Sequence, residues 1–180
     1  MLKFKPQLRR RVMFPPLEQL ITEIEQEAAS TRRLLERVPE DKLTWKPHTK
    51  SMSLGQLAFH VASTPGQVGD LLKLDGMDAK QAKLSPPEAT SSAQLLSTLD
   101  GSIKNATQIL QEMEEKEALG PWRLSNGDQE VFTMPRVGMA RTIMLNHWYH
   151  HRGQLTVYLR LLDVPLPATY GRSADHNPFA

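Results

Sequence analysis

The sequence has no cysteine, and this absence removes several classes of chemistry. Disulfides, iron–sulfur clusters, zinc–thiolate sites and cysteine nucleophiles all need a thiol that the chain does not carry. Any metal ion bound by this protein must therefore be held by histidine, aspartate, glutamate or water. Because thiol usage gives no clue to the compartment, a cytoplasmic location is the default expectation.

Long apolar runs and a strong charge imbalance are also missing. The chain has no stretch of roughly eighteen or more apolar residues, so we expect no transmembrane helix and no membrane partner. The formal net charge is only +2. The surplus lies near the start of the chain, in Lys3, Lys5, Arg9, Arg10 and Arg11. No basic stripe follows, so no nucleic-acid partner is predicted.

The length of 180 residues fits one domain with its own hydrophobic core. We interpret residues 1–14 as a solvated basic leader, because prolines at 6, 15 and 16 would interrupt an amphipathic targeting helix. The predicted helical domain covers residues 15–165, and an irregular C-terminal tail covers 166–180.

Four segments show the three- and four-residue apolar spacing of amphipathic helices. They are expected at about 16–38, 54–74, 91–119 and 136–163. Pro15 and Pro16 suit the start of the first, and Ser53 with Gln56 forms a capping box at the start of the second. Pro65 followed by glycine predicts a kink or a break inside the second segment.

The connections between these segments contain little strand signal. Residues 75–90 hold glycine and two prolines and are predicted to form a loop. The Asn126-Gly127 pair is a hairpin signal, so a small hairpin or an irregular loop is expected before the last helix. The sequence therefore predicts an all-α fold, a four-helix bundle, whose topology the long loop between helices two and three leaves open.

Two histidines interrupt the apolar stripe of the fourth segment. The stripe consists of Ala140, Met144, His147, His151, Leu155, Tyr158 and Leu162. His147 and His151 are four apart, so their side chains project from one side, the arrangement by which one helix offers two nitrogens to one metal ion. Burying an unpaired imidazole costs roughly 1–3 kcal/mol, which a metal would remove. Hydrogen bonding within the core, or a place at the mouth of the bundle, is the alternative.

A third histidine, His60, lies near the middle of the second segment, at the edge of its inner face. Three protein ligands leave coordination positions open for water or substrate, which is the pattern of catalytic rather than structural sites. The inner stripes of the second and fourth segments carry no aspartate or glutamate as an obvious fourth ligand. The sequence therefore predicts one divalent metal ion held by His60, His147 and His151.

Neighbouring polar residues have supporting roles in this hypothesis. His150 follows His147 by three residues, but it lies about 100° around the helix from His151. We interpret His150 as a supporting or interfacial residue. Gln154 lies close to the same face and is predicted to hydrogen-bond a ligand or substrate, or to pack as a supporting amide.

Four further residues near these motifs have simpler expectations. His48, in the connector before the second segment, is expected to be solvated or to approach the mouth of the bundle. Trp148 and Tyr149 are interpreted as packing residues. Arg152 is predicted to form an ion pair or a dimer contact.

Two parts of the chain together resemble the DinB/YfiT-like family. They are Leu57-Ala-Phe-His60-Val-Ala, preceded by Trp45-Lys-Pro-His48 and Ser51-Met-Ser-Leu54, and His147-Trp-Tyr-His-His151-Arg-Gly-Gln154-Leu. The resemblance covers about residues 16–163. It implies a four-helix bundle with up-down-down-up connectivity, often a homodimer. It also implies a divalent ion, typically nickel or zinc, on His60, His147 and His151.

The resemblance further implies a small-molecule reaction. Some members resemble thiol transferases that attach a low-molecular-weight thiol such as bacillithiol to electrophiles, and others have been called metal-dependent hydrolases. An open metal site suits both, because it can hold a thiol as thiolate or lower the pKa of bound water. We expect a thiol S-transferase first and a hydrolase second. A non-enzymatic, metal-stabilised binding or interaction module is the third alternative.

Overall fold

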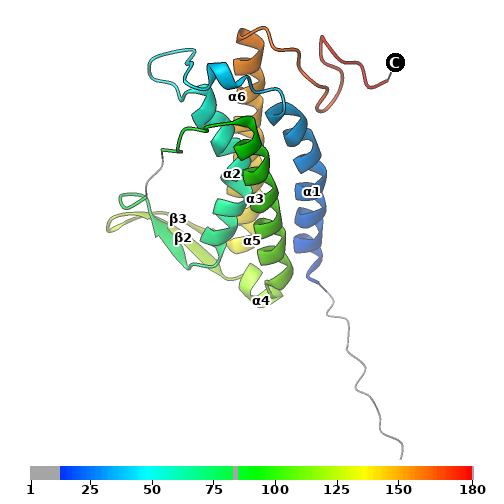
Figure 1. Cartoon of the computed structure of the whole chain (residues 1–180). Helices are drawn as coiled ribbons and strands as arrows, with labels where there is room; N and C mark the ends of the chain where they lie inside the picture. Colours follow the sequence, from blue (N-terminus) through cyan, green and yellow to red (C-terminus); the bar gives the residue numbers. More distant parts are fainter. Residues whose placement is uncertain (1–12, 83–84, 180) are drawn as a thin grey trace, which may run out of the picture.

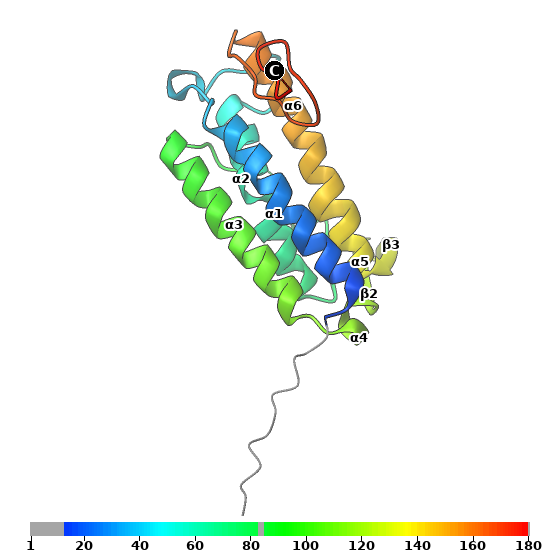
Figure 2. The same cartoon turned by 90° about the vertical axis from the view of Figure 1, so that its right-hand side faces the viewer.

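Four long helical segments lie side by side in the computed structural model, which describes residues 13–82 and 85–179 (Figures 1 and 2). They are α1 (Pro15–Leu35), α2 (Leu54–Leu72), α3 (Ser92–Glu112), and a final segment made of α5 (Arg136–Met139), the π-helix η2 (Ala140–Asn146) and α6 (His147–Leu161). Two short elements join them, the 3-10 turn η1 (Glu40–Lys42) and α4 (Glu115–Ala118). The apolar faces meet in one core, where Leu17, Leu34, Leu57, Leu95, Leu110 and Leu155 are among the fully buried side chains.

Contacts between neighbouring helices fix their directions. The pairs are Gly66–Ser102 and Gly69–Ala106 between α2 and α3, Glu23–Tyr149 and Glu27–Arg152 between α1 and α6, and Val61–Trp148 and Leu72–Arg136 between α2 and the final segment. Residue numbers rise together in the α2–α3 and α1–α6 pairs, so these helices are parallel. They run in opposite directions in the pairs between α2 and the final segment, so these two are antiparallel. The directions are therefore up for α1, down for α2 and α3, and up for the final segment (Figure 1).

The helices begin where local sequence signals predict. Pro15 and its neighbour occupy the first turn of α1. At α2, the Ser53 hydroxyl accepts the Gln56 N–H and the Gln56 amide oxygen accepts the Ser53 N–H, each at 3.0 Å. The Ser91 hydroxyl accepts the Gln94 N–H at 3.1 Å before α3. These bonds satisfy amides that the first turn of a helix leaves unpaired.

Of the kink or break predicted at Pro65, the break is absent, since α2 continues through this residue. Proline has no N–H to donate to the carbonyl four residues earlier, which here belongs to Val61. The indole N–H of Trp148 donates to that carbonyl at 2.8 Å. The N–H of Gly66 donates to the Ser102 hydroxyl at 2.7 Å. Other helices thus supply partners at the point where the proline interrupts the ladder of α2.

A three-stranded sheet makes the fold mostly helical rather than purely all-α. Its strands are β1 (Gly76–Asp78), β2 (Pro121–Asn126) and β3 (Gln129–Pro135), in the order β1-β2-β3. The antiparallel β2–β3 pair is the hairpin that the Asn-Gly signal predicts, with Gly127 at φ +64°. β1 pairs in parallel with β2, in a stretch that we predicted to be a loop. Its three residues show no alternation of buried and exposed side chains, so the sequence gives no strand signal there. The strand forms through its pairing with β2, which is distant in sequence.

The sheet and the final segment cap the C-terminal end of α2. Carbonyls in the last turn of a helix have no intrahelical N–H partner. Here the indole N–H of Trp122, from β2, donates to Leu71 O at 3.0 Å. The buried guanidinium of Arg136 donates to Leu72 O at 3.0 Å and to Leu74 O at 3.1 Å. The lower end of α2 is therefore fixed to both elements.

Other predicted boundaries need smaller corrections. The third predicted helix ends at Glu112 rather than near 119, and the separate helix α4 follows. The tail from residue 166 to 179 has no helix or strand, yet Arg160 holds it through Asp175 at 2.5 Å. Residues 1–12 of the predicted leader lie outside the described part of the chain. None of the described helices is long and apolar enough to cross a membrane.

The close approach of α2 and α3 generates a first prediction. A Cβ at Gly66 would lie 2.8 Å from the Ser102 Cα, which is backbone and cannot turn aside. We expect Gly66→Ala to lower the free energy of unfolding by about 1–3 kcal/mol. The matched control is Gly101→Ala on α3, where a Cβ would meet nothing within 4 Å. That change should raise stability by about 0.5–1 kcal/mol through helix propensity. Urea titration measures both, and equal stability of the two variants would contradict the predicted contact.

Candidate metal centre

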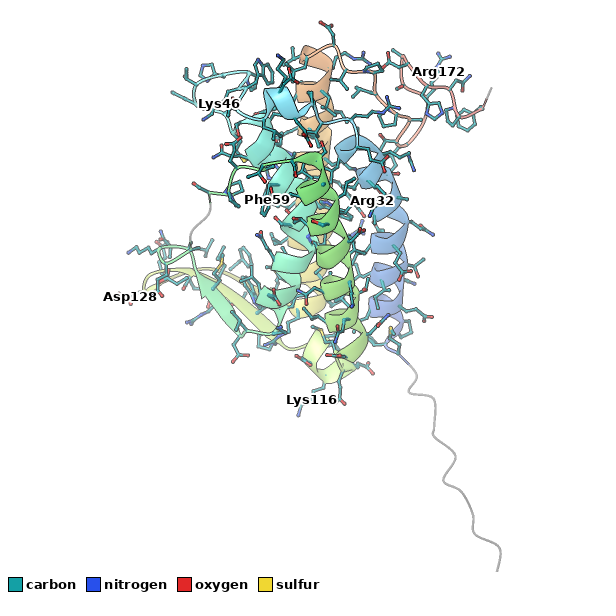
Figure 3. The ribbon with its side chains drawn as sticks, viewed as in Figure 1. Arg32, Lys46, Phe59, Lys116, Asp128 and Arg172 are labelled. Carbon is teal, nitrogen blue, oxygen red and sulfur yellow. The ribbon has the colours of Figure 1, made fainter. Side chains whose placement is uncertain are left out.

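Three imidazole rings converge between α2 and α6. His60 comes from the middle of α2, His147 is the first residue of α6, and His151 follows one turn later. One ring nitrogen from each lies within 4.8 Å of the other two. Figure 3 labels the neighbouring Phe59 on α2, between the Lys46 loop above it and the Asp128 hairpin below it. The structure therefore brings together the three residues predicted as ligands.

The spacing of the ring nitrogens suits one metal ion. The Nε2 atoms of His60 and His147 lie 3.0 Å apart. Two nitrogens bound at about 2.0–2.1 Å to one zinc ion lie roughly 3.0–3.4 Å from each other. The three ring centroids are 4.3 to 5.2 Å apart, and the rings stand at 79° to 87° to one another. Neutral imidazoles suit several divalent cations, including zinc, nickel, copper and iron.

A π-helix directly before His147 sets the direction of the ligand-bearing face. Turns in η2 are wider than α-helical turns, so they shift the phase of every residue that follows. The buried residues of this segment include a series at three- and four-residue spacing, which consists of Ala140, Met144, Trp148, Arg152, Leu155 and Leu159. His147 and His151 lie half-buried beside it. The predicted stripe holds at Ala140, Met144 and Leu155, but Trp148 and Arg152 are buried in place of His147 and His151. The two histidines therefore stand at the edge of the core rather than within it.

Gln154 fixes the protonation state of one ring. Its amide oxygen lies 2.8 Å from Nδ1 of His151, and its amide nitrogen lies 3.0 Å from Nε2 of His150. An amide oxygen only accepts hydrogen bonds, so Nδ1 of His151 carries the proton and Nε2 keeps its lone pair. Hydrogen bonds of this kind orient metal-binding histidines. Gln154 thus acts as a supporting amide, and the exposed His150 contacts it rather than joining the cluster.

His48 lies apart from the cluster in the exposed loop before α2, where its Nδ1 accepts the Lys50 N–H at 3.1 Å.

The loop that contains His48 is attached to α6 beyond His151. The ring of Trp45 meets Tyr158 edge-on at 5.8 Å, and the Tyr158 hydroxyl donates to Met52 O at 3.2 Å. The loop is therefore held against the face of α6 that carries the histidines.

Burial and mutual repulsion keep the rings neutral. Desolvation, helped by the neighbouring His151 and His147, lowers the pKa of His60 to about 4. Desolvation also lowers the pKa of His147, helped by His150. The pKa of His151 is lowered by desolvation and by His147, against an upward contribution from its bond to Gln154. At neutral pH the rings therefore offer lone pairs, which a cation needs.

The predicted ion pair of Arg152 is confirmed, and its partner is Glu27 on α1. The two side chains meet at 2.6 Å, and Arg152 is only 2% exposed. The guanidinium also donates to the Thr31 hydroxyl at 3.1 Å and lies 5.0 Å from the centre of the Tyr149 ring. The role of Glu27 was missed, although its place between the apolar Ile24 and Ala28 of α1 was a signal. This pair fastens α6 to α1 behind the histidines.

Comparisons with known proteins identify relatives along nearly the whole chain. The model of the DinB family matches residues 13–177. The Bacillus subtilis protein YrdA is 27% identical over 164 residues, which cover 91% of this chain and 93% of that protein.

Two solved structures share the fold. The DinB-like protein YjoA of Bacillus subtilis aligns with a TM-score of 0.61 and 19% identity, over 88% of this chain and 99% of that one. A DinB-like protein of Bacillus cereus aligns with a TM-score of 0.64 and 22% identity, over 85% and 97%. At 19% and 22% sequence identity, the similarity to these two structures supports a shared fold alone.

The lowered pKa of His60 generates a second prediction. An unfolded histidine titrates near 6.5 and the folded His60 near 4, so the unfolded chain binds more protons between these values. The stability of the metal-free protein should therefore fall as the pH drops from 6.5 toward 4. Urea midpoints across this range measure the effect. His60→Phe should flatten the profile, and a profile as steep as that of the wild type would contradict the assignment.

Proposed function

The chain belongs to the DinB family, and from that premise we propose that it is a metal-dependent enzyme whose single divalent ion, nickel or zinc, is bound by His60, His147 and His151. The observation that carries the proposal is the approach of three ring nitrogens to within 4.8 Å of one another. Three neutral ligands leave the charge of the ion uncompensated and leave coordination positions for an anionic partner. For the fold, we propose that the four long helical segments form the up-down-down-up bundle of the family, with the sheet added at one side. We also propose that the protein is a homodimer, as the family resemblance implies.

Within this proposal, the reaction is the transfer of a low-molecular-weight thiol of the bacillithiol type to an electrophile. A bound ion would lower the pKa of a coordinated thiol, or of water, until it is a nucleophile near neutral pH. The thiol comes from a cosubstrate, because the chain has no cysteine. Its sulfur forms the new bond to the electrophile, the leaving group departs with the electron pair of the broken bond, and the thiol proton is released to solvent.

The residues around the cluster contribute to binding and orientation. Gln154 keeps the proton of His151 on Nδ1, so that Nε2 faces the shared position. The pair of Arg152 and Glu27 holds α6 in place from the other side. These contacts restrict the rings before any ion arrives, which reduces the ordering needed on binding.

Metal content is the third prediction. The purified protein should hold about one divalent ion per chain, and His60→Ala or His147→Ala should reduce occupancy by roughly tenfold or more, since each removes one of the three ligands. Elemental analysis by mass spectrometry measures the content. His48→Ala is the matched control, because this exposed histidine lies outside the cluster and its loss should change nothing. Unchanged metal content in both cluster variants would rule out the site.

Metal-dependent conjugation is the fourth prediction. The metal-loaded protein, incubated with a low-molecular-weight thiol and a haloaromatic electrophile, should form a thioether that mass spectrometry detects. The product should disappear on chelation and in His147→Ala, which loses a ligand. Ester hydrolysis with the same metal dependence but no thioether would favour the hydrolase. If neither product forms and chelation only unfolds the protein, the ion is structural and the transferase proposal is wrong.

A further inference from the structure

One hydrogen bond joins α2 to α6 directly beside the histidine cluster. The indole N–H of Trp148 donates to the carbonyl of Val61 at 2.8 Å, and Trp148 is 0% exposed. Val61 follows His60 in sequence, and Trp148 follows His147. The bond therefore joins a side chain of α6 to the backbone of α2 at the residues next to His60 and His147, whose Nε2 atoms lie 3.0 Å apart.

The sequence of α2 makes the Val61 carbonyl available. In an α-helix this carbonyl accepts the N–H of the residue four positions later, and here that residue is Pro65, which has none. A buried carbonyl without a partner is costly, so the position favours a donor from outside the helix. An indole is a pure donor, and it brings no acceptor that would need a further partner. Pro65 and Trp148 are thus complementary across the α2–α6 contact.

With His60 and His147 taken as metal ligands, as proposed above, we propose that Pro65 and Trp148 are positioning residues for the metal centre. Their bond sets the register of α6 on α2. A shift by one residue would move a ring by about 1.5 Å along the axis and turn it by about 100°, away from the shared position. The tether is needed here because the wider turns of η2 directly precede His147, so a regular α-helix from Arg136 does not fix the phase of α6.

The chain contains a matched control for this bond. Trp122 is 1% exposed, and its indole N–H donates to Leu71 O at 3.0 Å. It too is a buried tryptophan that donates to a carbonyl of α2, although Leu71 O also accepts the Leu74 N–H at 3.0 Å. Leu71, however, lies eleven residues beyond His60, roughly 16 Å along the helix. Loss of Trp122 should therefore affect stability without affecting the histidines.

The test uses Co²⁺ as the probe, because its d–d absorption reports ligand geometry and its titration reports affinity. The wild type should bind it, and His60→Ala should not. Trp148→Phe should bind Co²⁺ roughly tenfold to a hundredfold more weakly, the range seen when supporting partners of metal ligands are lost, with a changed spectrum. Trp122→Phe should keep the affinity and spectrum of the wild type, although it also lowers the urea midpoint.

A double variant separates positioning from core stability. Pro65→Ala restores an N–H that can serve the Val61 carbonyl, so Pro65→Ala/Trp148→Phe should regain much of the urea midpoint lost in Trp148→Phe. It has no tether between the helices, so its cobalt affinity and spectrum should stay altered. If Trp148→Phe binds cobalt as the wild type does, or if affinity returns together with stability, the inference is wrong. If the wild type binds no cobalt, or His60→Ala binds it equally well, the metal site itself is wrong and the inference falls with it.

Discussion

Buried carbonyls of α2 must find hydrogen-bond donors, and the way they do so organises the molecule around this helix. Pro65 frees one carbonyl in the middle of α2, and Trp148 of α6 takes it. At the end of the helix, Trp122 of β2 adds a bond to Leu71 O, which also accepts the Leu74 N–H, and Arg136 donates to Leu72 O. Across residues 13–82 and 85–179, no buried side-chain nitrogen or oxygen lacks a partner. Because each donor comes from a different element, satisfying α2 also places the sheet and the final segment, and with them the histidines.

The final segment carries neutral polar side chains on the side that faces α2 and a charged side chain on the side that faces α1. Toward α2 it presents neutral imidazoles whose pKa values burial lowers, and toward α1 it presents the charged Arg152, paired with Glu27. A buried ion pair adds little net stability, but leaving one partner alone in the core is very unfavourable. The pair therefore resists rotation of α6 more than it stabilises the fold. Together with Trp148 it fixes the helix from both sides, which is what a site with three ligands from two helices requires.

Local signals in the sequence predicted the helix starts at Ser53 and Ser91, the hairpin at Gly127 and the pairing of His147 with His151 on one side of a helix. The addition of His60 to this pair rests largely on the family resemblance. Capping, turn chemistry and spacing depend on residues within a few positions, so they can be read directly. Two of the errors involve partners distant in sequence. β1 is a strand only because β2 lies beside it. α2 passes through Pro65 only because another helix donates to it. The apolar periodicity alone did not reveal the π-helix, which displaced the predicted stripe.

This displacement bears on the chemistry. Histidines at the centre of an apolar stripe would be sealed from solvent, whereas His147 and His151 stand half-buried at its edge. Partial burial there lowers the pKa values of both rings, which favours their neutral, metal-binding form. The π-helix thus precedes a helix whose two histidines keep partial contact with solvent instead of lying inside the core. Trp148 and Arg152 take the central positions that the histidines vacate. The residues that hold α6 in place are therefore next to the proposed ligands in sequence. One face of α6 packs in the core through Trp148 and Arg152, and the adjacent face carries the half-buried His147 and His151.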